Sequence, residues 1–163
     1  MNLSEAQEYL TNGATFLKYG KRGRPKPRHI FLIDKAISWR EPGSKATPLP
    51  KDQKKFIRYM PILDIKDITY GRGSDIFKRF QIKKESEKYR EQLSVTIHGG
   101  KRTLDLEAST ASELEQFIQM LTIVRDFIVQ EERINQGKAA IEEGQNYMQI
   151  AKVQSTSAIA PPD

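Results

Sequence analysis

Six basic residues lie within eleven consecutive positions, residues 18–28, and no acidic residue interrupts them. The formal net charge of the whole chain is +6, so the residues outside this stretch sum to zero and the positive charge is local. A local charge of one sign predicts one acidic partner, such as a phosphate group, whereas a diffuse excess mainly affects solubility. The six residues are Lys18, Lys21, Arg22, Arg24, Lys26 and Arg28.

The basic stretch also contains glycines and prolines, which predict a turn. Apolar residues precede it at Phe16 and Leu17 and follow it at residues 30–33, so we expect a charged loop between two strands. Before it, Ser4 and Gln7 have the spacing of a capping box and predict a short helix that ends at Gly13. Further strands are expected at residues 36–41, 56–59 and 62–70, with a long loop at 42–55 and a weak strand at 77–82.

Residues 93–106 carry the clearest local pattern in the chain. Apolar and polar residues alternate on both sides of Gly99-Gly100, which predicts a hairpin with these glycines as its two-residue turn. The period then changes at Ser109, where a hydroxyl cap and apolar residues three and four apart predict an amphipathic helix to about Glu132. Strands followed by one helix indicate an α+β fold.

Beyond this helix, Ile134, Ile141 and Met148 recur every seven residues, but Gly137 and Gly144 weaken a helix there. We therefore expect a helical extension at 133–152 that depends on a partner, and a disordered tail at 153–163. The rest of the chain is expected to form a short N-terminal helix at 1–11 and the main domain at 12–132.

Several classes of function lack the residues they need. The chain has no cysteine and two histidines, which excludes disulfides and thiolate catalysis and makes a metal site improbable. No nucleophile or phosphate-loop motif is present, so we expect no enzyme activity and no cofactor. No apolar run approaches the roughly 18–20 residues of a membrane span, so any membrane contact is expected to be peripheral.

Residues 12–130 resemble a pleckstrin homology (PH) domain of the phospholipase C-delta type. The matching pieces are the basic first hairpin, Trp39 in the third strand, residues 64–72, the second hairpin and the closing helix. The resemblance implies a PH-like barrel of about seven antiparallel strands, capped by the C-terminal amphipathic helix and flanked by helices. It also implies that the open end of the barrel binds an anionic lipid headgroup.

Carried over by position, the resemblance makes Lys18 and Arg28 the phosphate ligands. Lys101 and Thr103 occupy further headgroup positions, and Lys45 is the nearest candidate for a lysine expected after Trp39. The family's inositide motif has a second lysine where this chain has Gly20. This gap favours a smaller headgroup, phosphatidic acid, over a phosphoinositide.

Residues 16–32 and the flanking helices are also similar to acylated PH-domain proteins of apicomplexan parasites that sense phosphatidic acid. That similarity implies a lipoprotein on the cytosolic face of a secretory organelle, the microneme, with a role in exocytosis. The chain has Asn2 where N-myristoylation requires glycine, and no cysteine to carry an acyl group. On this interpretation the modified N-terminus lies outside the given sequence.

Two other classes of partner remain open. A nucleic-acid binder would also use a basic patch, but the cluster holds only Tyr19 as an aromatic residue for base stacking. A protein-interaction scaffold could use the stripe at 134–148 as a docking helix. Lipid or nucleic-acid binding would weaken steeply with salt, and apolar docking would not.

Overall fold

The computed structural model describes residues 2–43 and 58–158, with side chains described as far as residue 145. The chain divides into two compact units, Met1–Asp126 and Phe127–Asp163. Within the described ranges, no helix combines the length and the apolar character needed to cross a bilayer.

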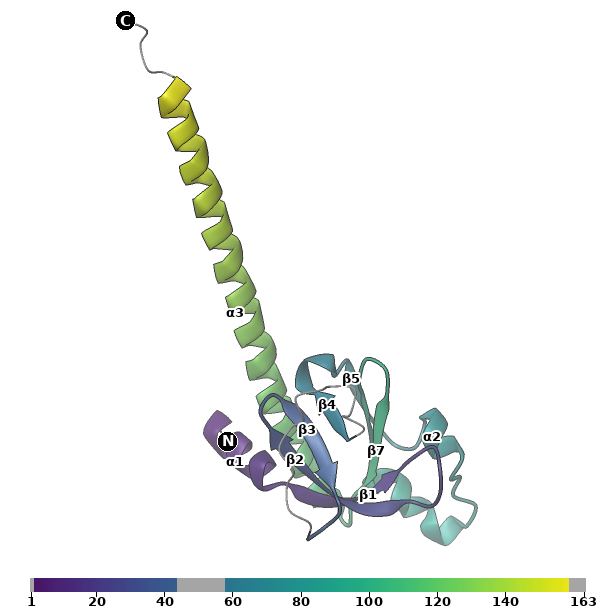
Figure 1. Ribbon diagram of the computed structural model, residues 1–163. Coiled ribbons are helices and arrows are strands. Elements are labelled where there is room, and N and C mark those ends of the chain that lie inside the picture. The colour runs from purple at the N-terminus through teal and green to yellow at the C-terminus, as the bar shows by residue number, and fades with distance from the viewer. Residues whose placement is uncertain (1, 44–57, 159–163) are drawn as a thin grey trace, which may run out of the picture. The chain divides into compact units, whose positions relative to one another are not determined.

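Seven antiparallel strands of the first unit form one sheet in the order β4-β3-β2-β1-β7-β6-β5 (Figure 1). The predicted α+β class and strand number are confirmed. The edge strands β4 and β5 do not pair in this order, so the sheet is open and not a closed barrel. The strands are β1 (Ala14–Tyr19), β2 (Lys26–Ile33), β3 (Ala36–Arg40), β4 (Tyr59–Pro61), β5 (Asp67–Tyr70), β6 (Ser94–His98) and β7 (Thr103–Glu107).

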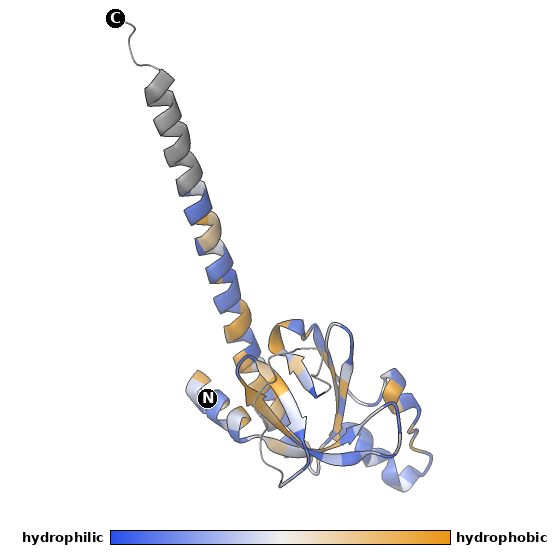
Figure 2. Cartoon of the chain, viewed as in Figure 1, coloured by the Kyte–Doolittle hydropathy of each residue, from blue (hydrophilic) through white to orange (hydrophobic). Residues whose placement is uncertain are grey.

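One face of the sheet forms the main core with the first part of helix α3 (Ala111–Ala158). The ring of Phe16 on β1 meets that of Phe117 on α3 edge-on, with 4.8 Å between centroids. In Figure 2, hydrophobic residues follow the strands, whereas the loop between β1 and β2 is hydrophilic. The buried residues of α3 in the first unit are Leu114, Phe117, Ile118, Met120, Leu121 and Val124.

The N-terminal helix α1 (Leu3–Asn12) begins earlier than predicted. Its capping box uses Asn2 and Glu5 in place of Ser4 and Gln7: the Glu5 amide donates to Asn2 Oδ1 at 2.8 Å. Asparagine and serine are about equally favourable N-cap residues, so residue type alone does not show whether the helix is capped by Asn2 or by Ser4. Gly13 ends the helix with φ 79°, and a Cβ there would lie 2.5 Å from the Ile30 carbonyl oxygen, so only glycine fits.

The hairpin of β6 and β7 is confirmed, but its turn is centred one residue later than predicted. His98 pairs with Thr103, and the Gly99 amide donates to the Arg102 carbonyl at 2.9 Å, so Gly100 and Lys101 form the tip. The apolar alternation is the same in both registers and could not distinguish them. A Cβ on Gly99 would lie 2.9 Å from Met60 Cε, the mobile end of a side chain, and 3.1 Å from the Arg102 carbonyl oxygen, so the space beside the turn is tight.

The weak strand predicted at 77–82 is wrong. This region contains the short helix α2 (Asp75–Lys78), and the 3-10 helix η3 (Glu85–Leu93) follows it. Phe77 is buried against Tyr19, with 4.8 Å between ring centroids, on the side of the sheet opposite the main core. A tertiary contact to β1 therefore overrides the weak local strand preference.

Helix α3 begins after Thr110, whose Oγ1 accepts a hydrogen bond from the Glu113 amide at 3.1 Å. The helix predicted to about Glu132 and the helical extension predicted at 133–152 form one continuous helix, because α3 continues to Ala158 and includes both Gly137 and Gly144.

Candidate functional site

Five of the six clustered cations line one pocket of about 170 Å3, the hairpin pocket. Lys18 on β1 and Lys26 and Arg28 on β2 share one side of the β1–β2 hairpin, because side chains alternate along each strand and residues paired across two strands lie on the same side. Arg22 and Arg24 lie in the loop between the two strands. No carboxylate is among the lining residues in the part of the chain that the structure describes. The lining residues are Lys18, Gly20, Arg22, Arg24, Lys26 and Arg28.

The pairing of β1 with β2 brings these cations close to one another. Lys18 lies directly opposite Lys26, and Arg28 lies opposite Phe16 on the same face. Like charges directly opposite each other in an antiparallel pair are destabilising. The hairpin therefore carries a repulsion that a bound anion would relieve.

Trp39 on β3 is buried on the same face of the sheet as Lys18, with 4% of its surface exposed. Lys18 Nζ lies 5.4 Å from the centroid of its ring, and the Arg102 guanidinium lies 4.8 Å from it. Burial lowers the pKa of Lys18, and repulsion from Arg102, Arg28 and Arg58 lowers it further, against an opposing effect of Asp105. Burial also lowers the pKa of Arg102.

The sequence analysis missed Arg102 and Arg58 as members of this cation group, which surrounds Lys18. Arg102 lies at the end of the β6–β7 turn and Arg58 lies just before β4, so neither is near the basic stretch in the sequence. Trp39, which the resemblance placed in the third strand, has two cations over its ring, Lys18 and Arg102. No local pattern marks these three residues.

A second, wide pocket of about 820 Å3 adjoins the same hairpin. Lys18 and Arg22 line both pockets. The wide pocket includes the carboxylate of Asp75, and Thr103 on its wall donates a hydrogen bond to the buried Asp105. These carboxylates make it a poorer anion site than the hairpin pocket. Its lining residues are Lys18, Tyr19, Gly20, Lys21, Arg22, Gly73, Ser74, Asp75, Ile76, His98, Lys101, Arg102 and Thr103.

The predicted headgroup residues thus fall into two groups that share Lys18 and Arg22. Arg24, Lys26 and Arg28 line only the hairpin pocket, and Lys21, Lys101 and Thr103 line only the wide pocket. The Thr103 hydroxyl already donates to Asp105 Oδ2 at 2.7 Å, so its proton is not directed at a ligand. Lys45 lies outside the described residues.

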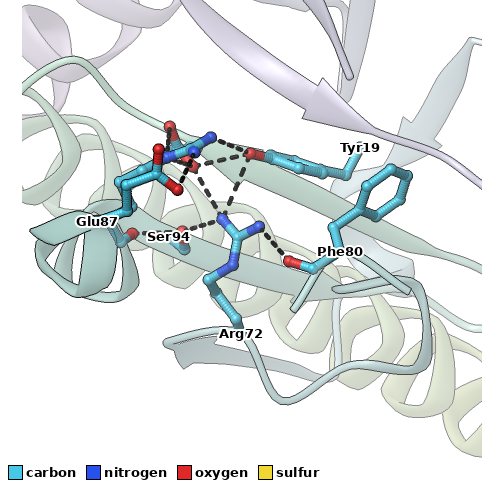
Figure 3. Close-up of polar contacts among 7 residues, drawn as sticks. Tyr19, Arg72, Phe80, Glu87 and Ser94 are labelled. Atoms are coloured by element: carbon cyan, nitrogen blue, oxygen red, sulfur yellow. Dashed lines mark hydrogen bonds and ion pairs between the residues drawn. The ribbon is translucent and has the colours of Figure 1, made fainter. Parts of the chain in front are cut away.

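A buried ion network on the opposite side of the sheet anchors the end of β1 that carries Lys18 (Figure 3). Arg72 Nη1 donates to Glu107 Oε1 at 2.8 Å, and the two side chains are 8% and 11% exposed. The Tyr19 hydroxyl donates to the same carboxylate oxygen at 2.8 Å, and Arg90 Nη2 donates to the Tyr19 oxygen at 2.9 Å. The Arg72 guanidinium also stacks on the rings of Tyr19 and Phe77. This network holds Tyr19, and hence its neighbour Lys18, in a defined position.

No protein-family model matches the sequence, and no curated protein matches it. Several solved structures are similar in fold. ISP1, inner membrane complex sub-compartment protein 1 of Toxoplasma gondii, has 13% identity and a TM-score of 0.50 over 76% of this chain and 90% of that chain. The PH domain from TgAPH has 13% identity and a TM-score of 0.48 over 77% of this chain and 90% of that chain. The N-terminal PH domain of human ARAP2 has 9% identity and a TM-score of 0.42 over 72% of this chain and 82% of that chain.

The architecture of the first unit agrees with the one that the resemblance implies: seven antiparallel strands in one open sheet, followed by a helix that covers its core face. The fold is PH-like. The similarity to ISP1, at 13% identity and a TM-score of 0.50, shows the fold alone. The PH-like fold places the basic hairpin beside the β6–β7 turn at one end of the sheet, where both pockets lie.

Replacement of Lys18 by methionine is expected to stabilise the PH-like unit while it weakens anion binding. Because the pKa of Lys18 is lowered in the folded state, the charged form opposes folding at neutral pH. Urea unfolding at pH 7 is expected to show a gain of less than about 1 kcal/mol, since solvent screens this half-buried group. The gain should shrink as pH rises from the folded-state pKa to the ordinary lysine value, where the wild-type lysine becomes neutral in both states.

In the same variant, the affinity for anionic vesicles should fall about fivefold, the effect of one cation near an anionic surface. The exposed Lys83, which lines neither pocket, provides the control: Lys83→Met should change neither stability nor binding. A loss of stability in Lys18→Met would show that Lys18 is a structural residue.

Proposed function

We propose that this chain is a non-catalytic membrane-binding module that reads an anionic phospholipid through the hairpin pocket. The observation that carries the proposal is the convergence of Lys18, Arg22, Arg24, Lys26 and Arg28 around one pocket of one hairpin. Cations held together without a lining carboxylate favour a phosphate ligand, which accepts several charge-assisted hydrogen bonds at once. The module would recruit or dock a peripheral protein at a cytosolic membrane face.

Phosphatidic acid is the favoured lipid because of the size and composition of the pocket. Its volume of about 170 Å3 is well below the roughly 300–1,000 Å3 of sites for larger ligands, which suits a phosphomonoester. Gly20 lies on its wall where the phosphoinositide pattern has a lysine, and a Cβ there would meet nothing within 4 Å. The pocket therefore has space but lacks a cation at the position that a second phosphate would need.

The strength of such binding suits reversible recruitment. Each cation near an anionic surface contributes about 1 kcal/mol, so the six clustered cations together contribute at most about 6 kcal/mol. This corresponds to a dissociation constant between roughly 1 mM and 1 μM, so stable residence needs a second attachment. The similarity to acylated PH-domain proteins supports a role on secretory organelles, in microneme exocytosis, with an acyl group as one such attachment.

Two alternatives have observations in their favour. A phosphoinositide would use the additional cations Arg58 and Arg102 around Lys18. A protein-interaction scaffold would use the exposed apolar residues Ile134 and Ile141 on α3.

Co-sedimentation with vesicles of matched total charge tests the lipid proposal. The vesicles carry phosphatidic acid, a bisphosphorylated phosphoinositide or phosphatidylserine in a neutral lipid background. The wild-type chain is expected to bind phosphatidic acid at least several-fold more tightly than the other two. In Gly20→Lys the added cation should raise the affinity for the phosphoinositide about fivefold or more. Gly20 is not among the residues with positive φ, so lysine can be accommodated there.

Other results would replace the proposal with a named alternative. A wild-type preference for the phosphoinositide would favour the second candidate. Equal affinity for all three vesicle types would indicate that the hairpin pocket binds anionic surfaces without headgroup specificity. No vesicle binding, together with peptide binding that survives high salt, would favour the scaffold. The control Gly100→Lys adds a cation at the tip of the β6–β7 turn, in open space and outside the residues lining either pocket, and should not alter the preference.

A further inference from the structure

The part of α3 in the second unit exposes large apolar side chains at regular intervals. Phe127, Ile134 and Ile141 are 43%, 50% and 62% exposed and are separated by seven residues. A seven-residue spacing keeps side chains on one side of a helix and is typical of a seam that packs against another helix. Isolated exposed apolar residues are ordinary, but a regular row of them marks an interaction surface.

Two glycines follow the same repeat. Gly137 and Gly144 each lie three residues after an exposed isoleucine, inside a helix where glycine is among the poorest residues. Among the described residues, nothing lies within 4 Å of a Cβ built at either position, and neither glycine has a positive φ. The chain's own packing and backbone therefore do not explain them. Small residues at this spacing permit close approach of a second helix.

We propose that this surface binds the same surface of a second copy of the chain, as an antiparallel helix pair. The segment Phe127–Ala158 has its midpoint between Glu142 and Glu143, and antiparallel pairing about that midpoint uses the whole segment. Ile141 of each copy then lies against Gly144 of the other. Three of the remaining four layers set a large residue position against a small one: Phe127 against position 158, Ile134 against position 151, and Gly137 against position 148, which are alanine, alanine and methionine in the sequence. The fourth layer is polar, with Gln130 against position 155, a serine in the sequence.

Charge selects the antiparallel orientation. In a parallel, in-register pair, flanking residues five apart face each other across the seam. Asp126 would then face Glu131, and Arg133 would face Lys138, so each of these like-charged pairs would occur twice in the dimer. Antiparallel pairing about the midpoint separates them and brings the backbone position of Glu131 beside that of Lys152, a residue of opposite charge.

The self-complementary pattern identifies the occupant as a second copy. A helix from an unrelated protein has no reason to match large residues to glycines in this chain's own repeat. A two-fold pair makes both surfaces identical, so one repeat satisfies both partners. Such a dimer joins two basic hairpins, and linked binding sites gain avidity on a membrane. Self-association itself does not rest on the lipid proposal, and it is tested without lipid.

Sedimentation equilibrium of the full chain without vesicles tests the pairing. The wild type is expected to be a dimer, and Ile134→Glu/Ile141→Glu a monomer at the same concentrations. Gln136→Glu/Ala139→Glu adds the same two charges away from the seam and should remain a dimer. Circular dichroism and urea unfolding check that the first unit stays folded in both variants. A monomeric wild type at high micromolar concentration, or a seam variant that dimerises like the control, would overturn the proposal.

The absence of cysteine from the chain permits a direct test of orientation. In the antiparallel pair, Ile141→Cys is offset from its counterpart by about 4.5 Å along the axis and should form an intermolecular disulfide on mild oxidation. Ile134→Cys is offset by about 25 Å from its counterpart and should not crosslink. Mixing it with Ala151→Cys should restore crosslinking. Equal crosslinking of the two single-cysteine chains would indicate parallel helices and would contradict the proposed orientation.

Discussion

Reversing the charge of both Lys18 and Arg28 is expected to lower the affinity for phosphatidic acid vesicles about 1,000-fold. The variant Lys18→Glu/Arg28→Glu changes the formal charge of the hairpin pocket by four units. At about 1 kcal/mol per charge, this change removes about 4 kcal/mol of binding free energy. Both residues lie on the same side of the hairpin, and Arg28 contributes to the lowered pKa of Lys18. Vesicle co-sedimentation across a protein titration measures the loss.

The control is Lys83→Glu/Lys84→Glu, which makes the same change in total charge. Both lysines are exposed, and neither lines the hairpin or the wide pocket. Salt at physiological strength screens exposed charges beyond about 8 Å, so the control should stay within about threefold of the wild type. If the two double variants lost affinity equally, binding would depend on total charge and the specific pocket would be rejected. Circular dichroism of both variants establishes that they remain folded.

Replacement of Glu107 by glutamine is expected to destabilise the PH-like unit by about 3 kcal/mol. Glu107 accepts hydrogen bonds from Arg72, Arg90 and Tyr19, and it is the carboxylate that pairs with both guanidinium groups (Figure 3). Glutamine keeps the shape but removes the negative charge that pairs with the nearly buried Arg72, whereas Arg90 retains Glu87 at 3.9 Å. Breaking one partner of a buried ion pair costs about 3–5 kcal/mol. Urea unfolding measures the loss.

A surface pair in the same region provides the control. Lys88 and Glu85 are 2.9 Å apart, and their side chains are 54% and 86% exposed. Glu85→Gln should change the free energy of unfolding by less than about 0.5 kcal/mol, because water screens the pair. An equally small effect of Glu107→Gln would mean that the network does not anchor Tyr19 and the end of β1.

Much of the frame could be predicted from sequence because it depends on local periodicity. Alternation over residues 93–106 predicted β6 and β7, and the change to a spacing of three and four predicted the first part of α3. A basic stretch between two apolar segments predicted the β1–β2 hairpin. Alternation within each strand, together with the pairing of Lys18 with Lys26, puts Lys18, Lys26 and Arg28 on one side, whereas Arg22 and Arg24 lie in the loop, to which alternation does not apply.

Other features of the fold could not be predicted, because the local pattern of apolar and polar residues is compatible with more than one structure. Two turn registers satisfied the same alternation in the β6–β7 hairpin, and only the pairing of His98 with Thr103 and the hydrogen bond from the Gly99 amide to the Arg102 carbonyl show which one is adopted. Residues 77–82 have a weak strand preference, but burial of Phe77 against Tyr19 requires a different backbone. The continuity of α3 beyond Glu132 was not predicted, because Gly137 and Gly144 were expected to weaken the helix there.

The sequence by itself determined that this protein carries a local positive charge on a hairpin, because charge and strand pleat are properties of neighbouring residues. Only the tertiary structure decided how that charge is arranged. It brings Arg58 and Arg102 from distant segments to Lys18, places Trp39 beneath two cations, and divides the predicted residues between two pockets. These neighbours are set by which strands pair and in which register, and that choice is made by the burial of the whole core.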